Sequence, residues 1–401
     1  MDTYTSGNPA NKGDCHVAYT PASTGELQIT VTSKIETMYG DSIRSLAAAA
    51  IAELGITAGE FTVADTGTLP FVIQARIEAV IKAAHPDLNR ESLPEMKDHS
   101  TYSSTRDRFR RSRLYLPGNQ PKLMLNAGIH KPDAIILDLE DSVAPSEKPS
   151  ARLIVRNALR VLDFFGAERM VRINQGDMGL EDLTAIVPHN VHLILIPKVE
   201  TPRQLVTVDQ HIQKVMADCK RTEPVFLMPI LESALGILNA LAIAQASANN
   251  VALAIGLEDY TADIGTQRTL EGTESFFARS MLVNAARATG LQPIDTVFSD
   301  VQDTAGLLAS VQEAKALGFD GKGCIHPRQI RPIHEAFAPT PSEIEKACKI
   351  VRAFEDAEAK GLGVVSLGSK MIDPPVVKRA QHSVQMAVTT GLLAKDWQKQ
   401  G

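Results

Sequence analysis

Short apolar runs alternate with amphipathic segments through the central part of the chain. Several of these runs are apolar nearly throughout, which is typical of parallel strands covered on the outside by helices. Eight such runs in sequence predict a closed (β/α)8 TIM barrel, of the α/β class, rather than an open doubly wound sheet. No G-x-G-x-x-G pattern follows the first run, which also argues against a dinucleotide-binding sheet. The predicted strands are 113–116, 134–139, 170–173, 193–196, 225–230, 251–255, 294–298 and 323–325.

A shorter pattern of mixed type precedes these runs. Apolar and polar residues alternate at 27–32, and an Ala-rich segment at 43–54 ends before Gly55. Alternation is typical of a strand with one buried face, and Ala favours a helix. Because two β-rich runs and a further helical segment follow, the pattern predicts a small α+β domain. Its remaining elements are strands at 61–65 and 68–73 and a helix at 76–84.

Polar stretches and a helical ending complete the predicted organisation. The start of the chain is rich in Gly, Pro, Asn and Ser, and a charged stretch that contains Pro94 separates the small domain from the barrel. Such compositions are typical of tails and linkers. We predict a flexible tail at 1–15, the α+β domain at 16–86, a linker at 87–110, the barrel at 111–335 and a C-terminal helical extension or lid at 336–401.

Composition excludes several classes of protein. A barrel needs only about 250 residues, so a chain of 401 residues has room for the additional domain. The hydrophobic fraction of 44% excludes a disordered chain. With 41 basic and 47 acidic residues, the net charge of −6 argues against a nucleic-acid partner, which would require a basic face.

The compartment can be inferred from the cysteines and from the N-terminus. The four cysteines are far apart and form no C-x-x-C pair, which is typical of reduced thiols. The first residues lack the basic and apolar regions of a signal peptide, and no run approaches the roughly 20 apolar residues of a membrane span. We therefore expect a cytoplasmic protein without a membrane partner.

Charged residues stand where the predicted barrel strands end. They include Glu140, Arg172, Glu232 and Asp259. Functional groups of a barrel collect at the carboxyl ends of its strands, and oxygen ligands without a His or Cys cluster suit Mg²⁺. Any one of these residues could instead cap a helix or lie in solvent. The sequence lacks zinc-ligand spacing, a G-x-S-x-G elbow and a P-loop.

At these same positions the chain resembles the β subunit of citrate lyase and its relatives in the HpcH/HpaI aldolase/citrate lyase family, the malyl-CoA and citramalyl-CoA lyases. The similar segments occur in the family's order and extend from Arg111 to the C-terminus. Two segments, 258–264 and 271–279, are closer to citrate lyase than to the malyl-CoA enzymes. The segments that carry the resemblance are 113–119 (RLYLPGN), 137–143 (LDLEDSV), 171–174 (VRIN), 196–200 (IPKVE), 231–237 (LESALGI), 256–260 (GLEDY), 321–327 (GKGCIHP) and 371–373 (MID).

The front domain separately resembles the citrate lyase γ subunit, an acyl carrier protein, through Tyr39-Gly40 and the segments 65–69 and 74–78. One departure is relevant to function. The serine that carries the CoA-like prosthetic group in the carrier should stand near Lys12, and no serine is found there. Either the domain has no acyl group and serves structure or docking, or the alignment slips in this part of the chain. The first interpretation favours a free CoA thioester as substrate.

The resemblance implies a lyase that splits a citryl thioester, as citryl-CoA or on the carrier, to oxaloacetate and an acetyl thioester by a retro-aldol or Claisen mechanism. It implies Mg²⁺ at Glu232 and Asp259 and catalytic roles for Arg172, Glu140 and Asp373. Arg172 would stabilise the enolate or bind a carboxylate, and Glu140 would position waters or the arginine. Asp373 would transfer a proton at a neighbouring subunit's site, on a segment that covers it.

The remaining expectations follow from the same resemblance. CoA, or a CoA-like group, would contact Tyr115, Lys322 and His326. A homotrimer or hexamer is expected, and a citrate lyase α-type subunit would be a further partner. Cleavage of malyl-CoA or citramalyl-CoA is the alternative activity. A non-catalytic subunit of a citrate lyase complex is the alternative of another class, but the complete set of acid, base and metal residues argues against it.

Overall fold

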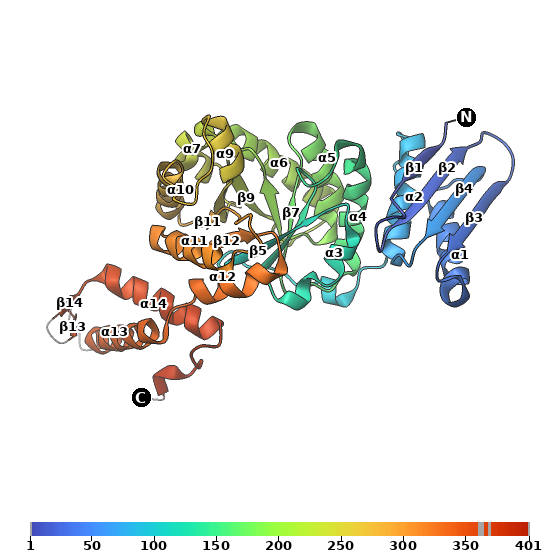
Figure 1. The fold of residues 1–401 in the computed structure, drawn as a ribbon. Coiled ribbons are helices and arrows are strands. Elements are labelled where there is room, and N and C mark those ends of the chain that lie inside the picture. Colours follow the sequence, from blue (N-terminus) through green and yellow to red (C-terminus); the bar gives the residue numbers. More distant parts are fainter. Residues whose placement is uncertain (1, 360–364, 368–369, 400–401) are drawn as a thin grey trace. The chain divides into compact units, whose positions relative to one another are not determined.

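The computed structural model describes residues 2–359, 365–367 and 370–399, and it divides into two compact units, Met1–Ile330 and Arg331–Gly401 (Figure 1). The first unit contains the small front domain and a barrel. The second contains the C-terminal helices. Each unit is described separately below.

The predicted barrel is confirmed. Eight parallel strands close in the order β10-β11-β12-β5-β6-β7-β8-β9, so consecutive strands are neighbours throughout. All eight apolar runs of the sequence correspond to these strands, and their ends agree to within three residues. The strands are β5 (Ser112–Pro117), β6 (Ala134–Asp138), β7 (Glu168–Arg172), β8 (Leu193–Ile196), β9 (Phe226–Leu231), β10 (Ala252–Ile255), β11 (Gln292–Asp295) and β12 (Gly321–Cys324).

Helices surround the barrel in Figure 1, and local signals mark several of their ends. At the start of α6, Thr201 and Gln204 form a capping box with Pro202 in the first helical position. Gly290, with φ of 73°, ends α10. The helices are α3 (Pro121–Leu125), α4 (Lys148–Val161), α5 (Gly176–Ile186), α6 (Pro202–Asp218), α7 (Ala234–Leu238), α8 (Ala240–Ala244), α9 (Leu257–Asp263), α10 (Phe276–Thr289) and α11 (Thr304–Leu317).

The front domain is a four-stranded sheet of order β1-β2-β4-β3 with two helices. It confirms the predicted α+β class but differs in detail. Residues 4–6, predicted to lie in a flexible tail, form an edge strand that pairs with 17–19. The predicted strand at 68–73 is wrong because Pro70 begins a helix there. The elements are β1 (Tyr4–Ser6), β2 (Cys15–Pro21), β3 (Leu27–Ser33), α1 (Glu36–Glu53), β4 (Gly59–Asp65) and α2 (Pro70–Ala84).

The front domain and the barrel are joined by α2 packing against α4. The guanidinium of Arg156 donates to both carboxylate oxygens of Glu78, at 2.8 and 2.7 Å, and neither side chain is exposed to solvent. Arg76 likewise binds both oxygens of Asp14 and donates to Ser150 of α4 at 2.7 Å. Buried, bidentate contacts of this kind fix geometry because neither charge can return to water.

The segment predicted as a linker packs closely against the barrel. Tyr102 donates to the carbonyl of Ala167 at 2.5 Å. Arg110 and Glu168 form an ion pair at 2.7 Å in which neither side chain is exposed. The high charge of this stretch therefore reflects contacts to the barrel as well as solvent exposure.

The C-terminal unit is built from two long helices. Apolar residues of α13 and α14, among them Ile350, Val351, Val377 and Val384, pack together with Trp397. This agrees with the predicted helical extension, whereas its function as a lid stays a prediction. Its elements are α12 (Ile330–Phe337), which begins at the boundary of the two units, α13 (Pro341–Ala359), β13 (Val365–Leu367), β14 (Lys370–Ile372), α14 (Pro374–Thr389) and the 3-10 turn Trp397–Lys399.

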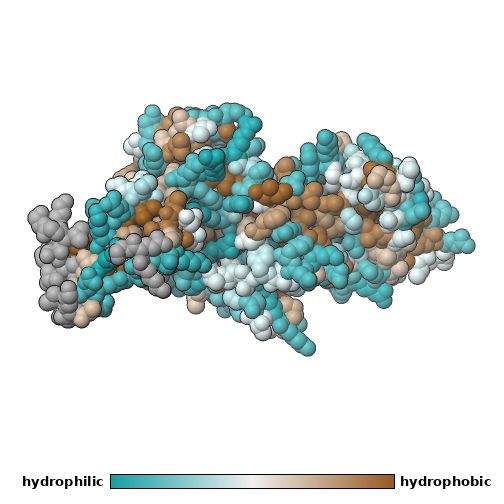
Figure 2. Space-filling model, turned by 90° about the horizontal axis from the view of Figure 1, so that it is seen from below, coloured by the Kyte–Doolittle hydropathy of each residue, from teal (hydrophilic) through white to brown (hydrophobic). Residues whose placement is uncertain are grey.

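The surface of the protein is mixed in character. Figure 2 shows one face on which hydrophilic residues predominate and apolar residues are exposed in separate patches. In the described residues, every helix is too short or too polar to cross a membrane.

Candidate active site

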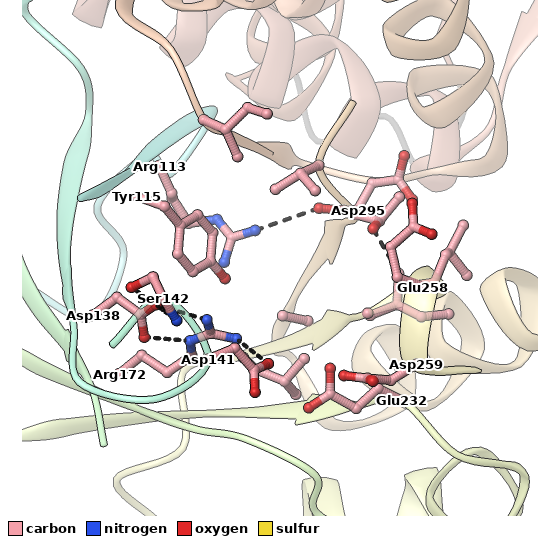
Figure 3. Close-up of a pocket in the computed structure, with 18 of the residues that line it drawn as sticks. Arg113, Tyr115, Asp138, Asp141, Ser142, Arg172, Glu232, Glu258, Asp259 and Asp295 are labelled. Carbon is pink, nitrogen blue, oxygen red and sulfur yellow. Dashed lines mark hydrogen bonds and ion pairs between the residues drawn. The ribbon is translucent and has the colours of Figure 1, made fainter. Parts of the chain in front are cut away.

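A cavity of about 360 Å³ lies at the carboxyl end of the barrel strands. Its walls come from most of the barrel strands and the loops that follow them, so residues far apart in the sequence face one another (Figure 3). The charged side chains that line it are Arg113, Asp138, Asp141, Arg172, Glu232, Glu258, Asp259 and Asp295. This is the edge of the barrel at which the sequence predicted a site.

Arg172 is held in place from one side of this cavity. Its Nε and Nη2 donate to the two oxygens of Asp138 at 2.6 and 2.8 Å, and its Nη1 lies 3.1 Å from Glu140. Burial alone would raise the pKa of Asp138, but the hydrogen bonds and charge of Arg172 hold it below the usual value. Asp138 is therefore an anion that orients the guanidinium. Tyr115 adds a further contact, since its ring lies 5.4 Å from the guanidinium carbon.

Glu232 and Asp259 form an acidic pair across the cavity from Arg172 (Figure 3). Burial of Glu232 raises the pKa of its carboxyl to about 7, and the charge of Asp259 adds to the rise. The only hydrogen bond to Glu232 that the structure shows among the described residues comes from the amide of Lys198, at 2.7 Å. Gly256 makes room for it, because a Cβ at this position would collide with the Glu232 carboxylate.

This pair has the chemistry of a partial Mg²⁺ site. Among the described residues, no group of three or more His, Cys, Asp or Glu side chains is arranged to hold a metal ion. A Mg²⁺ site does not require three such side chains, because the ion keeps several waters and accepts one or two carboxylates. A buried carboxylate with a raised pKa is also the group that gains most from a nearby cation. Glu232 and Asp259 therefore fit the predicted ion.

Lys198 and Glu140 connect the two sides of the site. The Lys198 Nζ lies 3.4 Å from Glu140 and 3.6 Å from Asp259. Lys198 has a left-handed backbone, with φ of 51°, directly after β8, a conformation that is uncommon for a residue with a side chain. Burial and the neighbouring Asp141 raise the pKa of Glu140, although Arg172 and Lys198 oppose the rise.

The structure brings five of the eight predicted site residues together, leaves two away from the cavity and has the eighth in the other unit. Arg172, Glu140, Glu232, Asp259 and Tyr115 surround the cavity. Lys322 is fully buried and donates to Asp295 at 2.7 Å, so it does not line the cavity. His326 accepts a hydrogen bond from the amide of Arg328 at the following turn. Asp373 is exposed at the start of α14 in the other unit. The roles of these three stay predictions.

Three further polar residues belong to the site, and the sequence had given none of them a role. Asp138 binds Arg172, and the Ser142 hydroxyl donates to Asp138. Lys198 forms ion pairs with Glu140 and Asp259. Each stands within four residues of a strand's carboxyl end. Their place near the carboxyl end of a strand could therefore have indicated all three residues. It could not show which of their side chains face the cavity.

Comparisons with known proteins agree with this architecture. Residues 111–327 match the family model of HpcH/HpaI aldolase/citrate lyase, and residues 5–84 match the acyl carrier protein model of the malonate decarboxylase delta subunit (MdcD). Both domains predicted from sequence resemblance are thus confirmed, the barrel as a lyase domain and the front domain as carrier-like.

Individual relatives cover the same part of the chain. Citrate lyase subunit beta of Escherichia coli K12 is 41% identical over 71% of this chain and 95% of its own length. Human mitochondrial citramalyl-CoA lyase is 35% identical over 70% of this chain and 86% of its own length. The structure of CitE from Mycobacterium tuberculosis in complex with magnesium, acetoacetate and coenzyme A is 28% identical, with a TM-score of 0.57, and covers 71% of this chain and 99% of that one. The chain belongs to the HpcH/HpaI aldolase/citrate lyase family and is a lyase.

Proposed function

We propose that the chain cleaves a citryl thioester to oxaloacetate and an acetyl thioester, with Mg²⁺ held by Glu232 and Asp259. The observation that carries the proposal is the arrangement of this acidic pair opposite an arginine that is already oriented, on one cavity of the barrel. The similarity to citrate lyase β subunits, at 41% identity against 35% for citramalyl-CoA lyase, favours the citryl group. The complex of the related CitE with magnesium and coenzyme A supports the ion and the thioester.

A bound Mg²⁺ would polarise the hydroxyl and carboxylate oxygens of the substrate. The chain itself supplies the remaining charges. The carboxylate of Asp138 fixes the plane of the Arg172 guanidinium, which leaves its Nη1 edge directed to Glu140 and the cavity. A fixed guanidinium stabilises an enolate oxygen or a carboxylate without first reorganising.

Glu140 is suited to hold a proton or a water beside the arginine. Its carboxylate lies between Arg172 and Lys198, and burial and Asp141 raise its pKa above the usual value. A raised pKa makes a carboxyl a better proton acceptor. Transfer of the second proton is assigned to Asp373 by resemblance alone.

The substrate we propose is a free CoA thioester. The position expected for the carrier serine holds Lys12, which is exposed, and no serine occurs between Gly7 and Ala22. The front domain also packs against the barrel through the fully buried ion pair of Glu78 with Arg156 and the hydrogen bond of Arg76 to Ser150. A prosthetic arm without an attachment residue cannot deliver the acyl group, so the thioester must come from solution.

The proposal is tested by incubating the full chain and Mg²⁺ with citryl-, citramalyl- or malyl-CoA and measuring the keto acid released. We expect citryl-CoA to give the highest kcat/KM. Asp259→Asn should lower turnover at least about 10³-fold, because it removes a ligand of the ion. Glu223→Gln, at an exposed position, is the matched control and should leave turnover unchanged.

Three results would contradict the proposal. A higher kcat/KM with citramalyl- or malyl-CoA would reassign the acyl group. Failure to cleave any of the three thioesters would indicate the non-catalytic subunit. Normal turnover by Asp259→Asn would refute the metal assignment.

A further inference from the structure

Three buried cations bind Asp295 beside the cavity, two of them at its carboxylate and one at its main-chain oxygen. Asp295, at the end of β11, is fully buried and accepts from Lys322 at 2.7 Å and from Arg279 at 3.2 Å. Arg113, on β5, is 1% exposed and donates to the main-chain oxygen of Asp295 at 3.4 Å. Because Lys322 and Arg279 already neutralise the Asp295 carboxylate, Arg113 adds a positive charge without a counterion. Figure 3 shows its guanidinium between Tyr115 and Asp295.

The hydrogen bonds of Arg113 are weak and incomplete. Its Nη1 donates to the sulfur of Met228 at 3.2 Å, and thioether sulfur is a poor acceptor. Its Nε is buried and has no hydrogen-bond partner. In the described part of the chain, no carboxylate forms an ion pair with Arg113. A buried guanidinium in this state is unfavourable unless an anion completes its contacts.

Packing of the barrel does not require a charge at this position. The inward-facing neighbours from other strands are apolar and include Met228, Ile230, Ala254 and Ile294. Arg113 and Tyr115 lie on the same face of β5, and both line the cavity. An apolar residue at position 113 would complete this layer of side chains, so the arginine is better explained by what the cavity binds.

The cavity therefore has two poles of opposite charge. Glu232 and Asp259 make one side acidic, and Arg113 makes the other basic. A ligand that fits both poles carries oxygens for a cation at one end and a separate anionic group at the other.

We propose that Arg113 binds a second carboxylate of the substrate and so selects acyl groups with two free carboxylates. This rests on the proposed function. Citryl-CoA retains two free carboxylates, whereas citramalyl-CoA and malyl-CoA retain one. The same difference separates the keto-acid products, since oxaloacetate has one more carboxylate than pyruvate. Arg113 would thus decide between substrates that share the chemistry of bond cleavage.

The test compares oxaloacetate with pyruvate binding to the full chain in the presence of Mg²⁺, by calorimetry, before and after Arg113→Met. Charged hydrogen bonds of this kind correspond to about 10- to 100-fold in affinity. We expect the wild-type protein to bind oxaloacetate at least tenfold more tightly than pyruvate. Arg113→Met should weaken oxaloacetate binding by about 10- to 100-fold and leave pyruvate binding within about twofold.

Two further variants separate selection from structure. Arg113→Gln removes the charge but keeps polar atoms, and it gives the same comparison if methionine is not tolerated. Arg169→Met removes another buried arginine of the barrel, one that binds the carbonyls of Leu159 and Tyr102 and does not line the cavity. It should lower stability and leave the oxaloacetate preference intact.

An unchanged oxaloacetate-to-pyruvate ratio in folded Arg113→Met or Arg113→Gln would overturn the inference. An equal loss of affinity for oxaloacetate and pyruvate would also overturn it, because a purely structural role of Arg113 predicts that result. Kinetics separate this from the proposed function. If the wild-type enzyme is active and Arg113→Met leaves its ratio of kcat/KM for citryl- and citramalyl-CoA unchanged, only the inference is refuted. If the wild-type protein cleaves neither thioester, the proposed function is refuted, and the binding comparison still decides the role of Arg113.

Discussion

Two regions of the first unit bury charged groups in opposite ways. At the contact of the front domain with the barrel, Arg156 is matched by Glu78 and Arg76 by Asp14, and each pair is bidentate. In the cavity, Glu232 and Arg113 are also buried, but neither forms an ion pair with any of the residues that the structure describes. The first arrangement is complete without a ligand. The second is complete only when something else supplies the missing charges.

This difference distinguishes structural from functional use of the same residue types. A buried ion pair whose charges are fully matched costs little stability once formed, and removal of one partner leaves the other charge uncompensated. A buried charge without a partner lowers stability in the free protein, and that cost is recovered when a ligand binds. The comparison therefore predicts opposite signs for mutations in the two regions.

The largest effect is expected at the contact between the domains. Arg156→Met leaves Glu78 buried with Lys82 as its remaining cation, and should lower the free energy of unfolding by about 3–5 kcal/mol, measured by urea denaturation. Adding Glu78→Leu should restore most of the loss. Arg44→Met, which breaks an exposed pair, is the control and should cost less than about 1 kcal/mol. Equal losses for Arg156→Met and Arg44→Met would show that burial does not matter here.

A smaller effect is expected from acid at the same contact. Burial alone would raise the pKa of Glu78, but the hydrogen bonds and charge of Arg156 hold it below its usual value of 4.5. The stabilisation is therefore fully present above pH 4.5 and is lost as the pH falls through the lower pKa of the folded state. Below pH 4.5, the melting temperature of the wild-type protein should fall more steeply than that of the double variant Arg156→Met, Glu78→Leu. Parallel curves would contradict the assignment.

The smallest effect, and one of opposite sign, is expected in the cavity. Without divalent ions, Glu232→Gln should raise the melting temperature by about 2–4 °C, because it removes an uncompensated buried charge and keeps an acceptor for the Lys198 amide. Excess Mg²⁺ should then stabilise the wild-type protein and leave the variant unaffected. A variant that is destabilised without Mg²⁺ would show that Glu232 is structural.

The barrel could be predicted from the sequence because its signal is local. Each strand is a short apolar run, and the order of strands follows the order of the chain. The site at the carboxyl ends of the strands followed from the same rule, which is why Glu140, Arg172, Glu232 and Asp259 were found. The rule could not show that Lys322 points away from the barrel interior, on the face of the sheet opposite to Arg113, where its ammonium donates to Asp295.

The two errors in the front domain have different physical causes. In α2, residues 71–78 are buried on every side because the helix lies between its own sheet and α4. A helix covered all round loses the amphipathic period, so its first turn resembled a strand. The edge strand at 4–6 was missed because a polar, partly exposed strand carries no apolar pattern.

The sequence by itself determined the fold class, the family and the edge of the barrel where chemistry takes place, since these depend on periodicity and on motifs that are local in the chain. Only the tertiary structure decided which charges are matched. Arg156 and Arg113 are both arginines in apolar surroundings, and their local patterns do not tell them apart. The counterion of Arg156 lies 78 residues away, and Arg113 has none among the described residues. Pairing of charges depends on distant segments meeting, which only the folded chain specifies.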